Sequence, residues 1–258
     1  MNIKLSIITI NRNNAEGLKR TILNVINQKF TDYEYIIIDG NSTDDSIEII
    51  KKYSEHVSFW VSEPDSGIYN AMNKGIKKAK GEYVIFMNSG DYFLNCDTLM
   101  NIFSKEHEAD LIAGNLIKKW KRQNEKRTIS PKITFYNFMS GSTPHHQATF
   151  TKRSLFDEIG FYDEELKISS DWKFFLLAIF KYDRSIEVID EYIAVMDTCG
   201  ISNSKIGITS MAKEQDETFR TYFPYFYEDY YELYRLKRFT FARLKKHIKW
   251  RLQFILRG

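Results

Sequence analysis

The sequence predicts an α/β protein whose mostly parallel sheet is covered by helices on both faces. Two observations lead to this fold class. Within the first 115 or so residues, short apolar runs rich in β-branched residues, typical of buried strands, alternate with segments whose apolar residues recur at helical spacing. Polar residues follow directly after several of these runs, at the carboxyl ends of the expected strands, which is where parallel sheets bind ligands.

The expected elements follow one another in a regular order. Strands are expected at residues 4–10, 33–38, 58–61, 82–87 and 110–113. The first helix should begin after Asn14, which is available as an N-cap, and further helices are expected at residues 43–53, 66–80 and 97–105. Beyond residue 115 the alternation stops, and we expect a strand near residues 146–151 and helices at residues 152–158 and 171–182. Residues 118–127 hold six Lys/Arg and are expected to form a mobile, solvated loop.

The composition excludes several classes of protein. With 43% hydrophobic and 28% charged residues over 258 positions, the chain has the balance of a soluble globular protein of one large or two fused domains. Cys96 and Cys199 are the only cysteines, which excludes a disulfide framework and a zinc ribbon. The first residues lack the pattern of a secretory signal, and no apolar stretch approaches the roughly 20 residues that span a bilayer. We therefore expect a cytoplasmic protein.

Common nucleotide-binding and hydrolase motifs are absent from the sequence. There is no GxxxxGK[ST] P-loop, and NRNN follows the first expected strand where a dinucleotide-binding fold would have GxGxxG. The nucleophile motif of α/β-hydrolases, GxSxG, is absent as well. The remaining candidates for chemistry are acids at strand ends.

Three acids follow three of the expected parallel strands. Asp39 ends the second strand, Asp65 follows the third and Asp91 follows the fourth. Because the carboxyl ends of parallel strands meet at one edge, these acids should converge on a single crevice. Such a crevice repels a bare phosphate unless a divalent cation bridges the two, and carboxylate with diphosphate oxygens suits Mg²⁺ or Mn²⁺. The alternative is that each acid simply makes a turn, as Asx residues often do.

Four stretches of the sequence resemble family 2 glycosyltransferases of the GT-A fold. They read SIITINRNN, IIIDGNSTDDS, SEPDSGIYNAMNKGIKKAKGEYVIFMNSGDYF and HHQATFTKRSLFDEIGFYDEELKISSDWKFFL, and the match extends over residues 4–194. The resemblance implies a Rossmann-like GT-A fold with a nucleotide-sugar-binding half at residues 1–115 and an acceptor-binding, catalytic half at residues 116–200. Residues 201–258 would form a Tyr-rich and basic helical extension. The implied activity is inverting transfer of a sugar from a nucleotide sugar, expected to be UDP-linked, to a polysaccharide or lipid-linked glycan, as in bacterial polysaccharide or lipopolysaccharide synthesis.

By this resemblance, one set of residues binds the donor nucleotide: Thr9, Asn11, Arg12, Asp39, Asp65, Lys74 and Asn88. The metal motif of the family usually reads Asp-x-Asp-Asp, whereas this chain has Asn88-Ser89-Gly90-Asp91. Asp91 is therefore expected to be the main protein ligand of Mn²⁺ or Mg²⁺. Asn88 would make only a neutral hydrogen bond to the ribose or diphosphate. Lys74 could instead be a solvated helix lysine.

The resemblance also places a catalytic base at Asp171, in the sequence Ser170-Asp171-Trp172. A carboxylate at a helix N-terminus is stabilised by the helix dipole and free N–H groups, which keeps it ionised and able to accept a proton. One base and no second nucleophile fit a single displacement with inversion. The resemblance places His145 and His146 by the acceptor or diphosphate, and Trp172 could stack on a sugar ring or belong to the core. The GISNS stretch at residues 200–204 resembles a loop that closes over the donor.

The net charge of +3 is unevenly distributed, because residues 235–258 contain nine Lys/Arg and no acid. Apolar residues there recur at steps of three and four: Phe241, Leu244, Ile248, Leu252 and Ile255. This pattern predicts an amphipathic basic helix that lies on the anionic inner face of the cell membrane, with Trp250 and the tyrosines of residues 222–234 at the interface. The apolar stripe could instead pack on the catalytic domain or pair with a second copy in a homodimer.

Three other functions stay open at this stage. A non-catalytic nucleotide-sugar or glycan-binding module is compatible with the reduced metal motif. A sugar nucleotidylyltransferase has a similar nucleotide-binding half, although NRNN is a poor match for its triphosphate-binding loop. The hypothesis of a nucleic-acid-binding protein is supported by the basic tail alone, and we expect no nucleic acid partner.

Overall fold

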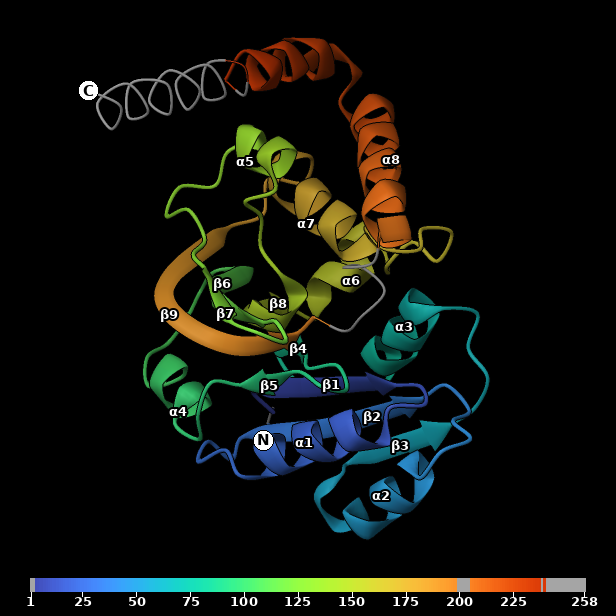
Figure 1. Ribbon diagram of the computed structural model, residues 1–258. Coiled ribbons are helices and arrows are strands. Elements are labelled where there is room, and N and C mark those ends of the chain that lie inside the picture. Colours follow the sequence, from blue (N-terminus) through green and yellow to red (C-terminus); the bar gives the residue numbers. More distant parts are fainter. Residues whose placement is uncertain (1–2, 199–204, 238, 240–258) are drawn as a thin grey trace, which may run out of the picture.

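The computed structural model describes residues 3–198, 205–237 and 239. The N-terminal part of the chain alternates strands and helices as expected (Figure 1). Its elements are β1 (Leu5–Asn11), α1 (Ala15–Ile26), β2 (Tyr33–Asp39), α2 (Ser46–Lys52), β3 (Phe59–Ser62), α3 (Ile68–Lys78), β4 (Tyr83–Phe86), β5 (Tyr92–Phe93) and α4 (Thr98–Ile102). Asn14 caps α1 as predicted, because its side chain accepts a hydrogen bond from the backbone N–H of Gly17 at 3.2 Å.

The C-terminal part completes the same sheet and adds a layer of helices. Its elements are β6 (Leu111–Lys119), β7 (Asn124–Arg127), α5 (Phe135–Ser140), β8 (Thr149–Lys152), α6 (Ser154–Ile159), α7 (Ser170–Phe180), β9 (Ile186–Asp197) and α8 (Lys205–Tyr222). The expected helices at residues 152–158 and 171–182 correspond to α6 and α7, and the expected strand at residues 146–151 is a short 3-10 turn (His146–Ala148) followed by β8.

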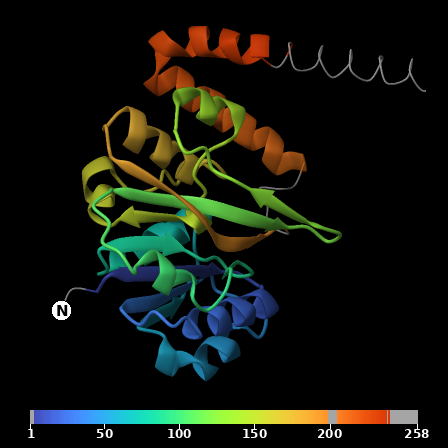
Figure 2. The ribbon, with the colours of Figure 1, turned by 90° about the vertical axis from the view of Figure 1, so that its left-hand side faces the viewer.

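The strands that the structure describes form one mixed sheet in the order β3-β2-β1-β4-β8-β6-β9-β5, with β7 paired to β6. The pairs β1–β2, β1–β4 and β2–β3 are parallel, as predicted for the N-terminal half. The second half is mixed instead, because β8 pairs antiparallel with both β4 and β6. Two views at right angles show the sheet running through both halves of the molecule (Figures 1 and 2). It therefore continues without a break across residue 115.

The core consists of two apolar layers, one on each face of the sheet. Successive residues of a strand point to opposite faces, so Ile8 and Ile10 belong to one layer and Leu5 and Ile7 to the other. Helices α3, α5, α7 and α8 cover the first face, and α1, α2 and α4 cover the second. Burial on both faces explains why these strands are continuous apolar runs in the sequence.

The prediction of a mobile loop at residues 118–127 is wrong. Strand β6 extends to Lys119 and turns back into β7, with Leu116 opposite Arg127 and Lys119 opposite Asn124. Strand β9 pairs with the other edge of β6 over the same residues, so main-chain hydrogen bonds from both sides hold these charged residues in strands. Most of these charged side chains are exposed, although Lys118 is partly buried, and an exposed charged side chain does not prevent its backbone from pairing in a strand.

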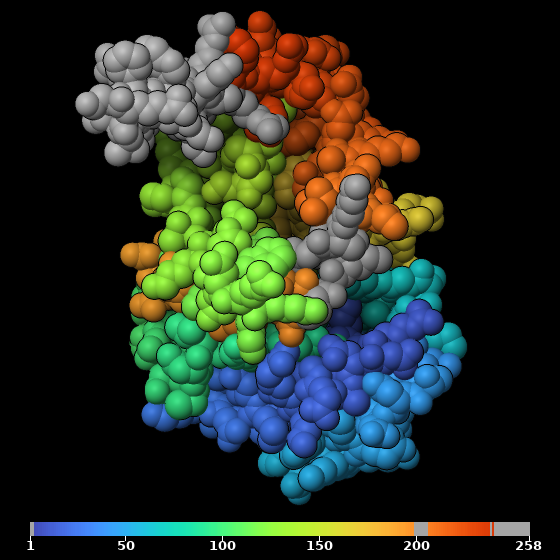
Figure 3. Space-filling model, viewed as in Figure 1, coloured from blue at the N-terminus to red at the C-terminus, as the bar shows by residue number. Residues whose placement is uncertain are grey.

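The described part of the C-terminal extension, residues 205–237, packs on α5 and α7 and caps that end of the molecule (Figures 1 and 3). Phe219, Phe223 and Tyr227 are buried in the first core layer, and the Tyr230 ring lies 4.9 Å from that of Phe135. Part of the tyrosine cluster that the sequence assigned to a membrane interface is thus core, whereas Tyr225 is 92% exposed.

Two predicted features lie outside the described residues: the loop at residues 200–204 and the helix of the basic tail beyond residue 239. No helix in the described part of the chain is both long and apolar enough to cross a bilayer.

Candidate functional site

The carboxyl ends of β1, β2 and β3 lie in register, so their terminal residues form one edge. Asn11 is paired with Asp39, and Asp39 with Ser62. The Asp39 carboxylate is fully buried and accepts four hydrogen bonds: from Asn11 Nδ2 (2.8 Å), Ser42 N (2.8 Å), Ser42 Oγ (2.6 Å) and Ser62 Oγ (2.7 Å). These donors satisfy both carboxylate oxygens. The buried Asp39 therefore holds the loop after β2 and the end of β3 in place.

Asp65 belongs to the same edge, and its side chain is only 8% exposed. One of its oxygens accepts from the backbone N–H of Gly67 at 3.2 Å and faces the Arg12 guanidinium at 4.0 Å. Its other oxygen crosses Gly40 so closely that a Cβ atom there would come within 2.1 Å of it. The absence of a side chain at Gly40 therefore lets the loops after β2 and β3 meet. Arg12 is two-thirds exposed, so its side chain is accessible beside Asp65.

Two residues predicted to contact the nucleotide have other roles. Thr9 is buried inside the sheet, where its hydroxyl donates to the Met87 carbonyl (2.7 Å) and lies 2.9 Å from the Tyr35 hydroxyl. Lys74 forms an ion pair with Glu63 (2.8 Å) and donates to the Pro64 carbonyl (2.8 Å). Thr9 thus joins strands, and Lys74 fixes the loop after β3, so neither side chain is placed to bind a phosphate.

The Asn88–Asp91 turn after β4 is held mainly by α1. The Asn14 side chain donates to the Ser89 carbonyl (3.0 Å), and the Thr21 hydroxyl donates to the Asp91 carbonyl (2.7 Å). The Arg20 guanidinium donates to the Gly90 carbonyl and to the Asp197 carboxylate, both at 2.7 Å. The backbone of Gly90 has a φ of +108°, a conformation that glycine adopts more readily than other residues. It forms the sharp turn that precedes Asp91.

Asp91 is 4% exposed and accepts a hydrogen bond from the backbone N–H of Asp197 at 2.8 Å. Burial raises the pKa of Asp91 to about 6, although hydrogen bonds from Asp197 N–H and Gln147 oppose the shift. A buried carboxylate in this state gains free energy when a cation arrives.

Asp171 lies at the second residue of α7 and receives two side-chain hydrogen bonds. His146 Nδ1 lies 2.6 Å from one carboxylate oxygen, and the Tyr69 hydroxyl donates to the other at 2.9 Å. Burial alone would raise the pKa of Asp171, but the bonds from His146, from Tyr69 and from the backbone N–H of Trp172 outweigh it and hold this pKa below its usual value. The carboxylate is thus ionised and oriented at neutral pH, as a general base must be.

A chain of hydrogen bonds links this base to the Asn88–Asp91 turn. An ionised carboxylate only accepts, so His146 Nδ1 carries the proton that it donates to Asp171. The other ring nitrogen, His146 Nε2, lies 3.2 Å from Asn88 Nδ2. The Asn88 Oδ1 atom is buried and makes no hydrogen bond within the described residues.

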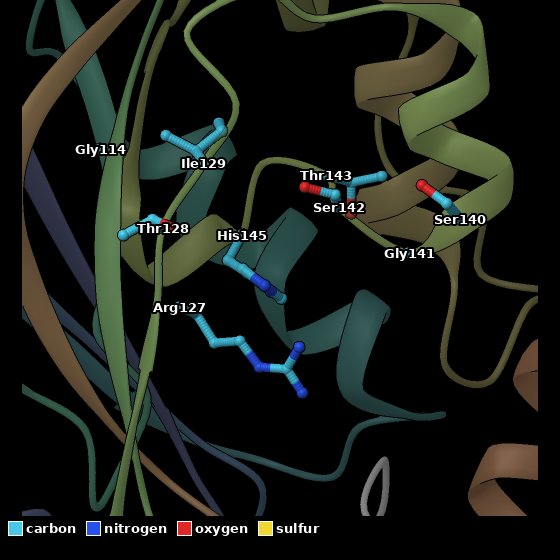
Figure 4. A pocket seen from close by; sticks show the side chains of 9 residues that line it. All are labelled: Gly114, Arg127, Thr128, Ile129, Ser140, Gly141, Ser142, Thr143 and His145. Atoms are coloured by element: carbon cyan, nitrogen blue, oxygen red, sulfur yellow. The ribbon is translucent and has the colours of Figure 1, made fainter. Parts of the chain in front are cut away.

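The remaining two predicted residues lie on the side of α5. Trp172 is 6% exposed and packs on Phe138 and Phe219 with ring centroids 5.7 and 5.1 Å apart, so it belongs to the core and cannot stack on a sugar. His145 lines a separate small cavity (Figure 4).

A divalent cation fits this site only together with an anionic ligand. Within the described ranges, no three His, Cys, Asp or Glu side chains are arranged to hold a metal ion. The available oxygens are the Asp91 carboxylate and the free Asn88 Oδ1 atom. Mg²⁺ and Mn²⁺ need about six oxygens, and they commonly take several from a bound diphosphate and water.

Sequence analysis missed Tyr69, Arg20 and Asp197 as parts of the site. Tyr69 and Asp171 are 102 residues apart, and Arg20 and Asp197 are 177 residues apart. No local pattern marks such pairs. The only available signal was the position of Tyr69 at the start of a helix that follows a strand end.

The fold is of the GT-A type, with acids at the edge of a sheet and a buried carboxylate, Asp171, at the start of a helix in the second half. The chain matches the family model Glycosyl transferase family 2 over residues 6–162, more than half of its length. It therefore belongs to glycosyl transferase family 2 and is a glycosyltransferase by class.

Three known proteins illustrate the relationship. An uncharacterized glycosyltransferase of Mycobacterium tuberculosis is 34% identical over 182 residues, covering 67% of this chain and 68% of that protein. The structure of S. aureus TarS 1-349 in complex with UDP-GlcNAc is similar with a TM-score of 0.66 at 20% identity, covering 84% of this chain and 66% of that chain. The mannosyltransferase PcManGT from Pyrobaculum calidifontis, in complex with GDP-Man and Mn²⁺, has a TM-score of 0.64 at 15% identity, covering 90% and 69%. The chain thus spans just under two thirds of the TarS chain, and these two likenesses show the fold.

Proposed function

We propose that this protein transfers a sugar, with inversion, from a UDP-sugar to a hydroxyl of a polysaccharide or lipid-linked glycan. The observation that carries the proposal is the arrangement of Asp171. Its carboxylate is ionised and held at two oxygens by His146 and Tyr69, and His146 in turn contacts Asn88 of the turn that holds Asp91. A proton acceptor is thereby placed one histidine away from the proposed diphosphate site.

The residues have separate tasks in this reaction. Asp65 and Arg12 would contact the nucleoside at the edge of the sheet, with Asp39 and Asn11 supporting the loop beneath them. Asp171 would accept the proton of the attacking hydroxyl, and His146 and Tyr69 would orient its carboxylate and stabilise its charge. Trp172 and Phe138 would exclude water from behind the base. Mn²⁺ or Mg²⁺, held by Asp91 with the diphosphate, would supply Lewis-acid stabilisation of the leaving group when bound.

The donor can be identified by binding and by turnover. Isothermal titration with UDP and with GDP, each with and without Mn²⁺, should show Mn²⁺-dependent binding of UDP and weaker binding of GDP. Release of UDP should then be measured for UDP-Glc, UDP-Gal and their N-acetyl forms. If the protein binds a UDP-sugar but does not transfer the labelled sugar to any acceptor, the chain is a nucleotide-sugar-binding module instead. Tighter binding of GDP would contradict the choice of UDP.

We further propose that the protein works at the cytoplasmic face of the cell membrane, bound through its basic C-terminal residues. The support comes from the nine Lys/Arg without an acid in residues 235–258 and from exposed apolar side chains at the start of this segment, including Leu236 (57%) and Phe239 (57%). Each basic residue near an anionic leaflet contributes on the order of 1 kcal/mol to binding.

Neutralising the tail should release the protein from anionic vesicles. In the full chain, Arg243, Lys245, Lys246 and Lys249 would be changed to Gln, and sedimentation with phosphatidylglycerol vesicles measured at low salt. The wild type should pellet and the variant should stay in the supernatant. The matched control changes four exposed helix lysines instead: Lys51, Lys52, Lys77 and Lys78. If all three proteins pellet equally, or if none does, binding through the tail is wrong.

A further inference from the structure

A small polar cavity lies in the second half of the molecule, between the β6–β7 hairpin and the segment after α5 (Figure 4). Its volume is about 120 Å³. The polar side chains that line it are neutral or cationic: Arg127, Thr128, Ser140, Ser142, Thr143 and His145. No Asp or Glu is among its lining residues in the described part of the chain. Figure 4 shows the Arg127 side chain and the His145 ring extending side by side into the same space.

The surroundings of the cavity are positively charged. Burial lowers the pKa of His145 to about 3, and the nearby positive charges of Lys118 and Arg127 act in the same direction. Burial also lowers the pKa of Lys118, again with Arg127 as a second cause. Lys118 and Arg127 are therefore close enough to repel each other, and an anion bound between them would reduce this repulsion.

The nearby acid does not cancel this charge. Glu125 accepts from the Arg127 guanidinium at 2.9 Å and from Trp120 Nε1 at 3.0 Å, so both of its oxygens have a partner. Arg127 has five N–H donors, and this contact leaves others available. Glu125 therefore holds the guanidinium in place at the cavity while Lys118 adds a second positive charge.

The size and position of the cavity decide what it can hold. Sites for nucleotide-sized ligands occupy about 300–1,000 Å³, so this cavity is too small for the donor. It could hold a group of a few heavy atoms. His145 precedes His146, whose Nδ1 lies 2.6 Å from Asp171, so the cavity lies in the same half of the molecule as the proposed base. The donor edge at Asp65 and Arg12 belongs to the other half of the sheet.

We propose that this cavity binds a phosphate group of the acceptor, next to the hydroxyl that receives the sugar. The inference rests on the proposed transferase function and specifies its acceptor class. A phosphate suits the site because its oxygens can accept bonds from the Arg127 guanidinium and several hydroxyls together, and the charge of Lys118 nearby also attracts it. The same group occurs in a phosphate-containing polymer and in a lipid phosphate, and the experiment separates these two sources.

In the first measurement, ³¹P NMR follows the binding of inorganic phosphate to the full chain saturated with UDP and Mg²⁺, which is diamagnetic and leaves the ³¹P signal sharp. Saturation with UDP removes competition from the diphosphate site. Arg127→Gln should weaken phosphate binding on the order of 10- to 100-fold, as expected for lost hydrogen bonds to a charged group. Lys118→Gln should weaken it less, because Lys118 acts only through its nearby charge. The matched control is Lys126→Gln. Lys126 is adjacent to Arg127 in β7 and points to the opposite face, where its ammonium lies 5.2 Å from the Tyr192 ring.

The second measurement compares acceptors. Glycerol 3-phosphate should accept sugar with a lower KM than glycerol in the wild type, and Arg127→Gln should raise the KM for glycerol 3-phosphate only. Octyl phosphate and glycerol 3-phosphate would then be compared as competitors of bound phosphate. Stronger competition by octyl phosphate indicates a lipid phosphate, and stronger competition by glycerol 3-phosphate indicates a phosphate-containing polymer. If phosphate binds equally to all variants, or does not bind, the proposal is overturned even when UDP-sugar turnover is normal. Loss of UDP binding in the wild type would instead disprove the proposed function.

Discussion

Replacing Asp171 by Asn should lower the turnover number by about 10²–10⁴-fold while leaving UDP affinity unchanged. A lost general base costs about this much. The variant should fold, because Asn has nearly the same shape as Asp. Its side chain can still accept a hydrogen bond from His146 and donate one to the Tyr69 hydroxyl. Turnover is measured as UDP release at saturating acceptor, and affinity by isothermal titration of UDP with Mn²⁺.

Asp163→Asn is the matched control for this variant. Asp163 precedes α7, has a pKa lowered chiefly through its contact with Lys173 against the effect of burial, and makes a 2.6 Å ion pair there rather than facing the site. Its turnover should stay at the wild-type level. Tyr69→Phe should give a smaller loss, about tenfold, since it removes one donor and leaves the base. If Asp171→Asn abolishes UDP binding instead, Asp171 belongs to the donor site and another group is the base.

The pH dependence of turnover should agree with this assignment. The hydrogen bonds to Asp171 hold its pKa below the usual value, so the carboxylate stays ionised as the pH falls from 7 towards 5. It becomes protonated only as the pH falls through that lowered pKa. Any loss of activity near pH 6 must therefore come from another group.

The N-terminal half of the fold could be predicted because its signals are local. A buried parallel strand such as β1 is apolar throughout, and Asn14 caps the helix that follows within four residues. The hairpin and β9 could not be predicted in this way. Strands β6 and β9 are held by pairing between residues 75 positions apart, as in Ile112 with Glu187. The β6–β7 hairpin pairs locally, but its strands contain exposed charged residues such as Lys119, which are typical of loops.

The site divides in a similar manner. Strand-end acids such as Asp65 and Asp91 were predictable, because the ends of parallel strands must meet at one edge. The partners of Asp171 were not, because Tyr69 reaches it only where the N-termini of α3 and α7 come together. Thr9 shows the opposite error: a family motif placed it at the nucleotide, but alternation along β1 directs its side chain into the core.

Replacing Asp91 by Asn should abolish Mn²⁺-dependent UDP binding and lower transfer by about 10³-fold, the value of several kcal/mol of Lewis-acid stabilisation. The Asn oxygen can still accept the hydrogen bond from Asp197 N–H, so the turn should remain intact, whereas Ala would leave that buried donor unpaired. Excess EDTA should reduce the wild type to the same level and should not reduce the variant further. Asp97→Asn, at an exposed ion pair with Lys29, is the matched control.

The pH dependence of wild-type binding gives this prediction a second test. Burial raises the pKa of Asp91 to about 6, so its carboxylate is charged above that pH and protonated below it. Metal ions bind the deprotonated form, so UDP affinity in Mn²⁺ should fall about tenfold for each pH unit below 6. The same slope should be absent without Mn²⁺ and in Asp91→Asn. Excess EDTA removes the divalent cation. If the wild type still transferred sugar in excess EDTA, no metal would be needed, and the proposed role of Asp91 as a metal ligand would be wrong.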